Sequence, residues 1–269
     1  MIQPVHYAPP QELADYVSFY GIMESEKNLS EPYISPPLGL SGFIIMLHGT
    51  NRPTINGVPM MKHPHVATGQ ATAPVVGEII GRNKTIMVFM PPLGMYQLFG
   101  CTMAALTNTS LPLSEFLGQE EYETLMEQLL TAKSNEEQIA VLNAFFLAQK
   151  PVFTVAEPII KALDYIHERQ GNVSISDIET ACFITRRSLE RHFQVCVGLS
   201  PKAYAKIYRF KCFMNFLQEN PQMTWTELCE RQGFFDHSHL TRYFTDFLGI
   251  KPHELVNVNL EFINFLLQE

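Results

Sequence analysis

Two stretches near the end of the chain follow the same pattern. The first reads Ser188-Leu189-Glu190-Arg191-His192-Phe193 and continues to Gly198-Leu199-Ser200-Pro201. The second reads His239-Leu240-Thr241-Arg242-Tyr243-Phe244 and continues to Gly249-Ile250-Lys251-Pro252. Leucine, arginine, phenylalanine, glycine and proline recur in register, each 51 positions after its counterpart. The C-terminal third therefore contains an internal repeat, which is the strongest indication of fold in the sequence.

Each repeat has the chemistry of two short helices joined by a turn. Leucine and phenylalanine four positions apart lie on one face of a helix and bury that face. The arginine between them points away from it, and the glycine and proline that follow end one helix and begin the next. This pattern predicts two helix-turn-helix units whose second helices present basic side chains outward. A helical solenoid is the alternative, but two repeats are too few to form one.

The remainder of the C-terminal third also has the periodicity and the caps of helices. Ser174 and Thr224 are each followed three positions later by an acidic residue, as in a capping box. Ser200-Pro201 and Lys251-Pro252 place proline at a first helical position, and Gly198, Gly233 and Gly249 mark breaks between helices. The sequence thus predicts an all-α domain of about seven helices over residues 151–269.

The first hundred residues have a different pattern, with short apolar runs bounded by glycine, proline and asparagine. The runs at 42–47 and 85–90 are examples, and they favour an antiparallel barrel or sandwich. Helical spacing follows at 113–132, and a second helix is expected from Ser134 to about Gln149. We therefore expect a β-rich domain with a helical hairpin over residues 1–150, and a linker at 149–158.

The charge is unevenly distributed along the chain. Its net charge is −8, and 46% of its residues are hydrophobic. Residues 1–150 contain 7 Lys and Arg against 13 Asp and Glu, whereas residues 182–211 contain seven basic residues and one acid, Glu190. This basic window lies in the first repeat and its following helix, where a solvated face and a polyanion-binding face are both compatible with it.

At these residues the sequence resembles the AraC/XylS family of bacterial transcription regulators. The resemblance covers residues 158–256 and is strongest from Gly233-Phe234 through Arg242-Tyr243-Phe244 to Gly249-Ile250-Lys251-Pro252-His253-Glu254-Leu255. It implies sequence-specific binding to double-stranded DNA, with recognition helices at about residues 185–196 and 236–247 in successive major grooves. It also implies a long helix at about residues 201–218 that joins the two units. One departure is Phe183, which stands where the family usually has a glycine in the first turn. We expect that turn to be reshaped.

The resemblance also assigns candidate DNA contacts. Outward residues of the two recognition helices are the candidates for base edges, with arginine suited to guanine and glutamate to cytosine. Basic residues of the connecting helix, including Lys211, are the candidates for phosphates. The residues expected to bind DNA are Arg186, Arg187, Glu190, Arg191, Lys202, Lys206, Arg209, His237, Ser238, Thr241 and Arg242.

Two roles are open for residues 1–150. One is a sensor that binds a small-molecule effector in an apolar pocket, and the other is a dimerisation or interaction module without a ligand. In the second case we expect a homodimer through apolar faces of the helices at 113–149, formed by Leu125, Met126, Leu129, Leu142, Phe145 and Phe146. Family resemblance further implies RNA polymerase as a partner.

Other functional classes find little support. No GxSxG, HExxH, GxGxxG or P-loop motif occurs, so we expect no enzyme and no cofactor. His63-Pro64-His65 lacks an acidic partner at metal-site spacing, and the five cysteines have no CxxC pair, so we expect no metal. The chain has neither a secretory signal nor an apolar run of membrane-spanning length, and we expect a cytoplasmic protein without a membrane partner.

Overall fold

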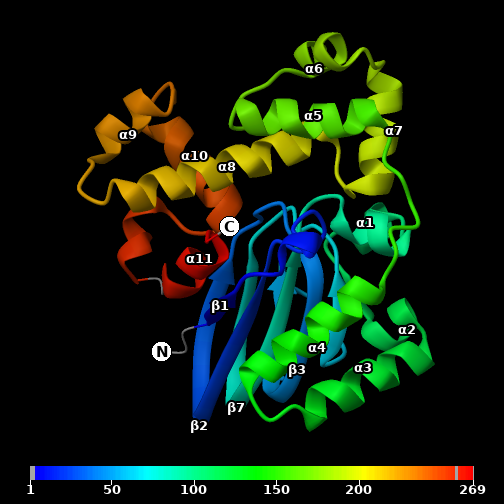
Figure 1. Ribbon diagram of the computed structural model, residues 1–269. Coiled ribbons are helices and arrows are strands. Elements are labelled where there is room, and N and C mark those ends of the chain that lie inside the picture. Colours follow the sequence, from blue (N-terminus) through cyan, green and yellow to red (C-terminus); the bar gives the residue numbers. More distant parts are fainter. Residues whose placement is uncertain (1–3, 258–259, 269) are drawn as a thin grey trace.

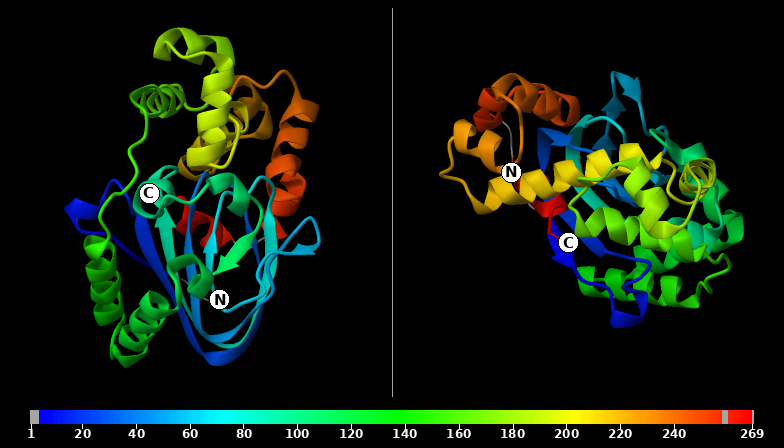
Figure 2. Two further views of the ribbon diagram at one scale, coloured as in Figure 1. Left: turned by 90° about the vertical axis from the view of Figure 1, so that its right-hand side faces the viewer. Right: turned by 90° about the horizontal axis from the view of Figure 1, so that it is seen from above.

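The structure, a computed structural model, describes residues 4–257 and 260–268. The N-terminal part forms one curved antiparallel sheet with helices at its side, and the C-terminal part is a layer of helices over one end of that sheet (Figure 1). A long helix crosses this layer, as the view from above shows (Figure 2). The predicted β-rich and all-α parts are both confirmed.

The sheet contains eight strands in the described residues, and its pairings are all antiparallel. The order along the main path is β1-β2-β7-β3-β6-β8, with β4 and β5 forming a small hairpin against β7. The strands are β1 (Val5–Tyr7), β2 (Phe19–Ser35), β3 (Ser41–Asn51), β4 (Thr54–Ile55), β5 (Val58–Pro59), β6 (His65–Thr68), β7 (Val75–Met90) and β8 (Ser110–Pro112). Register shifts in the β2–β7 and β3–β7 pairs increase the local twist, which suits a curved sheet.

Both faces of the central strands are buried. Successive side chains of a strand point to opposite faces, so Ile86 and Val88 enter one core while Met87 enters another. The same alternation separates Phe19 from Tyr20 on β2. Burial on both sides explains why the run at 85–90 is continuously apolar rather than alternating. The sheet is therefore the middle layer of the molecule.

One face of the sheet packs against the N-terminal helices α1 (Gly94–Phe99), α2 (Leu113–Leu117), α3 (Gln119–Thr131) and α4 (Asn135–Ala148). The single helix expected at 113–132 is broken, because Gly118 adopts a φ of +87° between α2 and α3. The helix expected from Ser134 is confirmed, and the Ser134 hydroxyl accepts a hydrogen bond from the amide of Glu137.

The expected dimer face on these helices is wrong for five of its six residues, and the sixth, Phe145, is half-buried. Leu125, Met126 and Leu129 of α3 are buried in the core against the sheet, as are Leu142 and Phe146 of α4. The helical periodicity identified an apolar face, but this face covers the protein's own sheet. A second copy of the chain cannot use it without unfolding the domain.

The C-terminal part contains the helices α5 (Glu157–Glu168), α6 (Ile175–Cys182), α7 (Arg186–Cys196), α8 (Pro201–Glu219), α9 (Trp225–Arg231), α10 (His237–Leu248) and α11 (Leu260–Leu266). The expected recognition helices correspond to α7 and α10, and the expected long helix corresponds to α8. Proline at the first position of α8 and the hydroxyl of Ser200 at its cap define its start.

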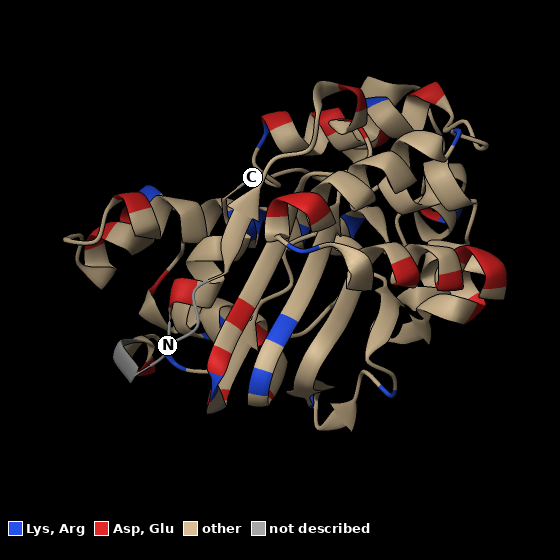
Figure 3. Ribbon diagram, turned by 60° about the horizontal axis from the view of Figure 1, so that its bottom comes forward, with Lys and Arg blue, Asp and Glu red and all other residues tan. Residues whose placement is uncertain are grey.

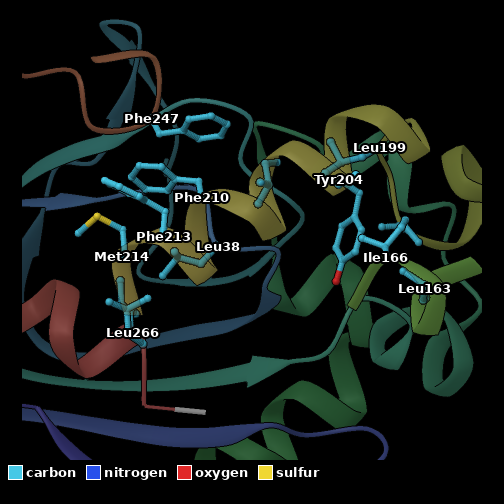
Figure 4. Close-up of a cluster of buried hydrophobic side chains, with 14 of the residues drawn as sticks. Leu38, Leu163, Ile166, Leu199, Tyr204, Phe210, Phe213, Met214, Phe247 and Leu266 are labelled. Carbon is cyan, nitrogen blue, oxygen red and sulfur yellow. The ribbon is translucent and has the colours of Figure 1, made fainter. Parts of the chain in front are cut away.

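The other face of the sheet shares one hydrophobic core with the C-terminal helices. Leu38, from the segment between β2 and β3, lies in the same buried cluster as Phe213 of α8 and Leu266 of α11 (Figure 4). Phe265 of α11 packs its ring against Phe19 and Phe89 of the sheet. The two parts are thus joined by a continuous apolar core in addition to the linker.

Candidate nucleic-acid interface

Two side chains cap the N-terminus of helix α7, and one face of the helix is buried. The Thr185 hydroxyl accepts from the amide of Ser188, and the Glu179 carboxylate accepts from the amide of Arg186 at 2.7 Å. Leu189 and Phe193 are fully buried, as the repeat predicts. Arg187 and Arg191 are exposed on the outside of the helix, together with Arg186.

Arg186 and Glu190 form an ion pair along the outer side of α7. The Arg186 Nε donates to the Glu190 carboxylate at 2.9 Å, and the side chains are 66% and 43% exposed. An exposed pair four positions apart contributes only about 0.3–0.5 kcal/mol. Either side chain is therefore readily released to a DNA partner, and the two are not independent of each other.

Helix α10 repeats this construction. The Asp236 carboxylate caps it by accepting from the amide of His239 at 2.7 Å, while Leu240 and Phe244 are buried. Of the predicted base contacts, His237, Ser238 and Arg242 are exposed and Thr241 is half-buried. The His237 ring also contacts the Thr226 hydroxyl of α9 at 3.2 Å, which ties the start of α10 to its partner helix.

A hollow between α8 and α10 gathers basic side chains from both helices. Its volume is about 380 Å³. Its lining includes Lys202, Lys206 and Arg209 of α8, and Arg242 of α10. Among the lining residues that the structure describes, Asp246 supplies the one carboxylate. Arg242 therefore lies beside the residues that the sequence assigned to phosphates, whereas Arg191 is on α7, outside this hollow.

Two residues of α8 differ from what their sequence suggested. Arg209 is half-buried: its guanidinium lies 5.6 Å from the Phe234 ring centre and donates to the Gln232 carbonyl at 3.1 Å. It thus holds the second unit against α8. Lys211 is only 6% exposed, and burial lowers its pKa to about 8. The expectation that Lys211 contacts phosphate is wrong, because its side chain faces the interior.

The first turn departs from the second in the way Phe183 suggested. Phe183 ends α6 in the left-handed region, with a φ of +51°, where the second unit has Gly233 with a φ of +68°. In each unit the backbone amide of the next residue donates a hydrogen bond to a carbonyl of the preceding helix. The Ile184 amide donates to the Glu179 carbonyl, and the Phe234 amide donates to the Cys229 carbonyl. The first turn is one residue shorter, since Thr185 follows Ile184 directly whereas Phe235 stands between Phe234 and Asp236.

A second candidate site is an apolar cavity on the C-terminal side of the sheet. It has a volume of about 130 Å³. Met23, Ile44 and Met87 line it from the sheet, and Phe262 and Leu266 of α11 line it from the C-terminal part. The Tyr33 hydroxyl donates to Asn51 at 3.0 Å, and burial raises the pKa of Tyr33 to about 12. No Lys, Arg, Asp or Glu is among the described lining residues.

The histidines considered for a metal are otherwise engaged or isolated. The His65 ring contacts the Tyr122 hydroxyl at 2.8 Å and the Met46 carbonyl at 3.2 Å, and burial lowers its pKa. His63 is exposed. Over residues 4–257 and 260–268, no three His, Cys, Asp or Glu side chains are grouped in a way that suits a metal ion.

Known proteins match the chain where the two units lie. A family described as a helix-turn-helix domain matches residues 179–257, from within α6 to beyond α10. This match supports the resemblance of the C-terminal part to the AraC/XylS family. The chain is accordingly a DNA-binding transcription regulator. Its residues 5–112, which form the sheet, match a domain of unknown function (DUF6597). No curated protein matches the regulator in sequence.

Solved structures resemble the regulator at low sequence identity. An apo variant of ToxT from Vibrio cholerae is 10% identical, with a TM-score of 0.48, over 89% of this chain and 97% of that one. Wild-type ToxT from Vibrio cholerae with a bound unsaturated fatty acid is 13% identical, with a TM-score of 0.43, over 87% and 96%. The AraC-like transcriptional activator CuxR is 16% identical, with a TM-score of 0.31, over 81% and 96%.

The charge of the regulator is consistent with a DNA-binding surface confined to one region. Acidic residues are frequent on the helices beside the sheet (red in Figure 3), and Glu120 and Glu121 lie in the first turn of α3. The basic hollow lies instead between α8 and α10. None of the helices in the described part of the chain has the length and hydropathy that a membrane span requires.

Proposed function

We propose that the regulator reads a specific DNA sequence by placing α7 and α10 in successive major grooves. The observation that carries this proposal is that Arg191 and Arg242 occupy equivalent positions in the two units. Each is exposed on the outer side of its helix, opposite a buried leucine and phenylalanine, at positions related by the repeat. A guanidinium so placed is suited to the O6 and N7 atoms of guanine. Arg187, Ser238 and Thr241 extend the same outer surfaces.

The basic hollow suits the phosphate backbone between the two grooves. Lys202 and Lys206 are exposed at its rim, and a phosphate there also lies near Arg242. Contacts of this kind fix the position of the protein without selecting a sequence. Arg209 supports this surface from behind, since its guanidinium is held by Gln232 and the aromatic rings of Phe234 and Tyr243.

The test is selection of a binding site from random DNA duplexes with the full-length chain. We expect one preferred sequence with two blocks about one helical turn apart. Affinity should fall with salt by about 0.9 in log–log slope for each phosphate contact, so six contacts give a slope of about −5. Recovery of no preferred sequence, or binding that salt does not weaken, contradicts the proposal.

We also propose that a small molecule acts at the N-terminal part of the regulator, in the cavity between the sheet and α11. An apolar cavity with a few polar groups is the usual form of a ligand site. This cavity combines Met23, Ile44 and Met87 with the Tyr33–Asn51 pair. Because Phe262 and Leu266 of α11 complete its lining, an occupant contacts the C-terminal part directly.

Thermal-shift screening of the full-length chain against a metabolite library tests this second proposal. A compound that binds only the folded state raises the melting temperature, by mass action. A compound that acts in the cavity should lose its effect when Met87 is replaced by Trp to fill the space. A library-wide absence of shifts would favour the alternative, in which the N-terminal part is an interaction or dimerisation module without a ligand.

We propose RNA polymerase in the bacterial cytoplasm as a further partner, on the strength of the family resemblance alone. A homodimer is compatible with two-block operators, but its interface must lie elsewhere than on the buried faces of α3 and α4. Light scattering at tens of micromolar, with and without the selected DNA, measures the oligomeric state.

A further inference from the structure

Each helix-turn-helix turn presents one phenylalanine almost wholly to solvent. Phe183 is 96% exposed and Phe235 is 92% exposed, the highest values among the large hydrophobic side chains of the described residues. Exposed apolar side chains this large are unfavourable in water, and most others in this chain are buried. The turns themselves do not require them, because Ile184 and Phe234 are the residues that pack inward.

Phe183 is also held in a backbone conformation that does not suit it. Its φ of +51° is in the left-handed region, which is unfavourable for a residue with a side chain. The second unit uses Gly233 at the corresponding helix end, so the fold itself calls only for glycine there. A large side chain that is both strained and exposed stabilises nothing within the protein. Such an outlier points to a role outside the folded chain.

Both phenylalanines lie next to the helix ends that approach the bases. Phe183 is three positions before Arg186, the first residue of α7, and Phe235 is two positions before His237, the first residue of α10. In helix-turn-helix proteins it is the N-terminal part of the recognition helix that contacts base edges. A phenyl ring neither donates nor accepts a conventional hydrogen bond, so it cannot read the polar pattern of the groove. The apolar group that the major groove offers is the 5-methyl of thymine.

We propose that Phe183 and Phe235 are specificity-determining residues that each contact a thymine 5-methyl group, one at each block of the operator. The inference rests on the proposed function, because it requires α7 and α10 to enter major grooves. The arginines of these helices then select guanine, and the phenylalanines select thymine at the block edge nearest each turn. Contact with the methyl group removes apolar surface of the phenyl ring from water, and this burial is what each phenylalanine contributes to the affinity for DNA.

The test uses the full-length chain, the selected operator and a set of duplexes in which deoxyuridine replaces one thymine at a time. Deoxyuridine pairs like thymine but lacks the methyl group. The wild type should lose about fourfold in affinity at one position in each block, the worth of one buried methyl group. Phe183→Ala should be insensitive to the substitution in one block, and Phe235→Ala in the other, while each binds the thymine duplex at least fourfold more weakly than the wild type.

Two controls separate this contact from a loss of folding. Phe183→Gly removes the ring and relieves the backbone, so it should melt at or above the wild-type temperature while binding as weakly as Phe183→Ala. Leu130→Ala removes another exposed side chain, 64% exposed on α3, and should bind all duplexes as the wild type does. Phe183→Gly that binds as the wild type overturns the inference.

The outcomes distinguish this inference from the proposed function. Selection without a preferred sequence contradicts both. A preferred sequence that the Phe→Ala variants bind with wild-type affinity contradicts the inference alone, and loss of transcription with unchanged DNA affinity assigns the phenylalanines to a protein partner instead. Weaker binding that is equal on thymine and deoxyuridine duplexes at every position also overturns the methyl contact.

Discussion

Arginine and lysine side chains of the C-terminal part occupy three different environments. Arg191 and Arg242 are exposed on the outer sides of their helices, Lys202 and Lys206 are exposed at the hollow, and Arg209 and Lys211 are drawn toward the interior. In the sequence all of them except Arg242 belong to one basic window, residues 182–211. Only the first two environments offer a charge to DNA, so the effective basic surface is smaller than the composition suggests.

Arg191→Ala and Arg242→Ala should each weaken binding to the selected operator by about 1–3 kcal/mol and relax the preference at one base position. Folding should be unaffected, because both side chains are exposed. Lys206→Ala is the matched comparison: it should weaken all sequences equally and reduce the salt slope by about one. Binding curves on operator and scrambled duplexes measure this. Equal losses on both DNAs for an arginine variant would assign that residue to phosphate.

Lys211→Met should change how stability depends on pH. Burial lowers the pKa of Lys211 to about 8, below the usual value near 10.5, so between these values the unfolded chain binds a proton that the folded chain does not. Stability in the wild type therefore gains from rising pH in this window, and below pH 8 the charged form is at its most costly. The variant should exceed the wild type most at pH 7 and least near pH 10.

Urea unfolding at pH 7, 8, 9 and 10 measures this difference. Lys206→Met, an exposed lysine on the same helix, is the control and should give a difference from the wild type that does not vary with pH. Each variant is compared with the wild type at the same pH. The titration of the tyrosines and cysteines, which all three proteins share, therefore cancels in the difference. A Lys211→Met difference that stays constant across the four pH values would mean that burial does not shift this amine.

At the scale of secondary structure, the helices of the two units were predictable and their surroundings were not. Caps such as Ser174, Thr224 and Asp236 act within one turn, so residues close in sequence determine where α6, α9 and α10 begin. The partner of an apolar face depends on residues far away in sequence. The faces of α3 and α4 were therefore recognised as apolar but assigned to a second copy of the chain rather than to the sheet.

The same distinction applies to the candidate site. Repetition of the pattern identified the outward side of α7 and α10, because helix geometry alone determines that side. The position of Arg209 depends on Phe234, which lies in the turn between α9 and α10, and nothing in the sequence around Arg209 indicates this contact. The sequence does carry a local indication that Phe235 is exposed. The turn contains two adjacent phenylalanines, and Phe234 is the one that is buried.

The packing of α11 on the sheet depends on a glycine in β2. A Cβ at Gly21 of β2 would lie 2.3 Å from the Phe265 ring, so only glycine leaves room for it. Gly21→Ala should therefore destabilise the chain by about 1–3 kcal/mol, as overpacking does. In a Phe265→Ala background the same substitution should cost much less, since the ring is gone and only the contact with the end of the Met87 side chain, at 3.1 Å, remains tight. Urea unfolding of the four proteins measures this cycle, and additive effects would show that the two sites do not interact.

For the whole molecule, the shared core has a thermodynamic consequence. Leu38, Phe213 and Leu266 belong to one buried cluster that spans the sheet and the C-terminal helices (Figure 4). The Thr107 hydroxyl also donates to the Gly198 carbonyl at 2.7 Å, which attaches the first unit to the N-terminal part. Neither part can unfold without exposing the apolar face of the other, and this couples their stabilities.

The full-length chain should therefore unfold in one calorimetric transition, with equal calorimetric and van't Hoff enthalpies. Phe265→Ala weakens the shared core and should lower the temperature of the entire transition rather than split off part of it. Differential scanning calorimetry of both proteins provides the measurement. Two resolved transitions in the wild type would show that the parts fold as independent domains.

The continuous core also restricts how a chain of this kind can change by recombination. Regulators diversify readily when a reader and a sensor are joined by a linker alone, because recombination can exchange one without disturbing the other. Here a new N-terminal part would have to supply the surface that receives Phe265 and Leu266, including the glycine at position 21. The two halves must therefore evolve together, and a hybrid gene joined at residues 149–156 would encode two mismatched surfaces.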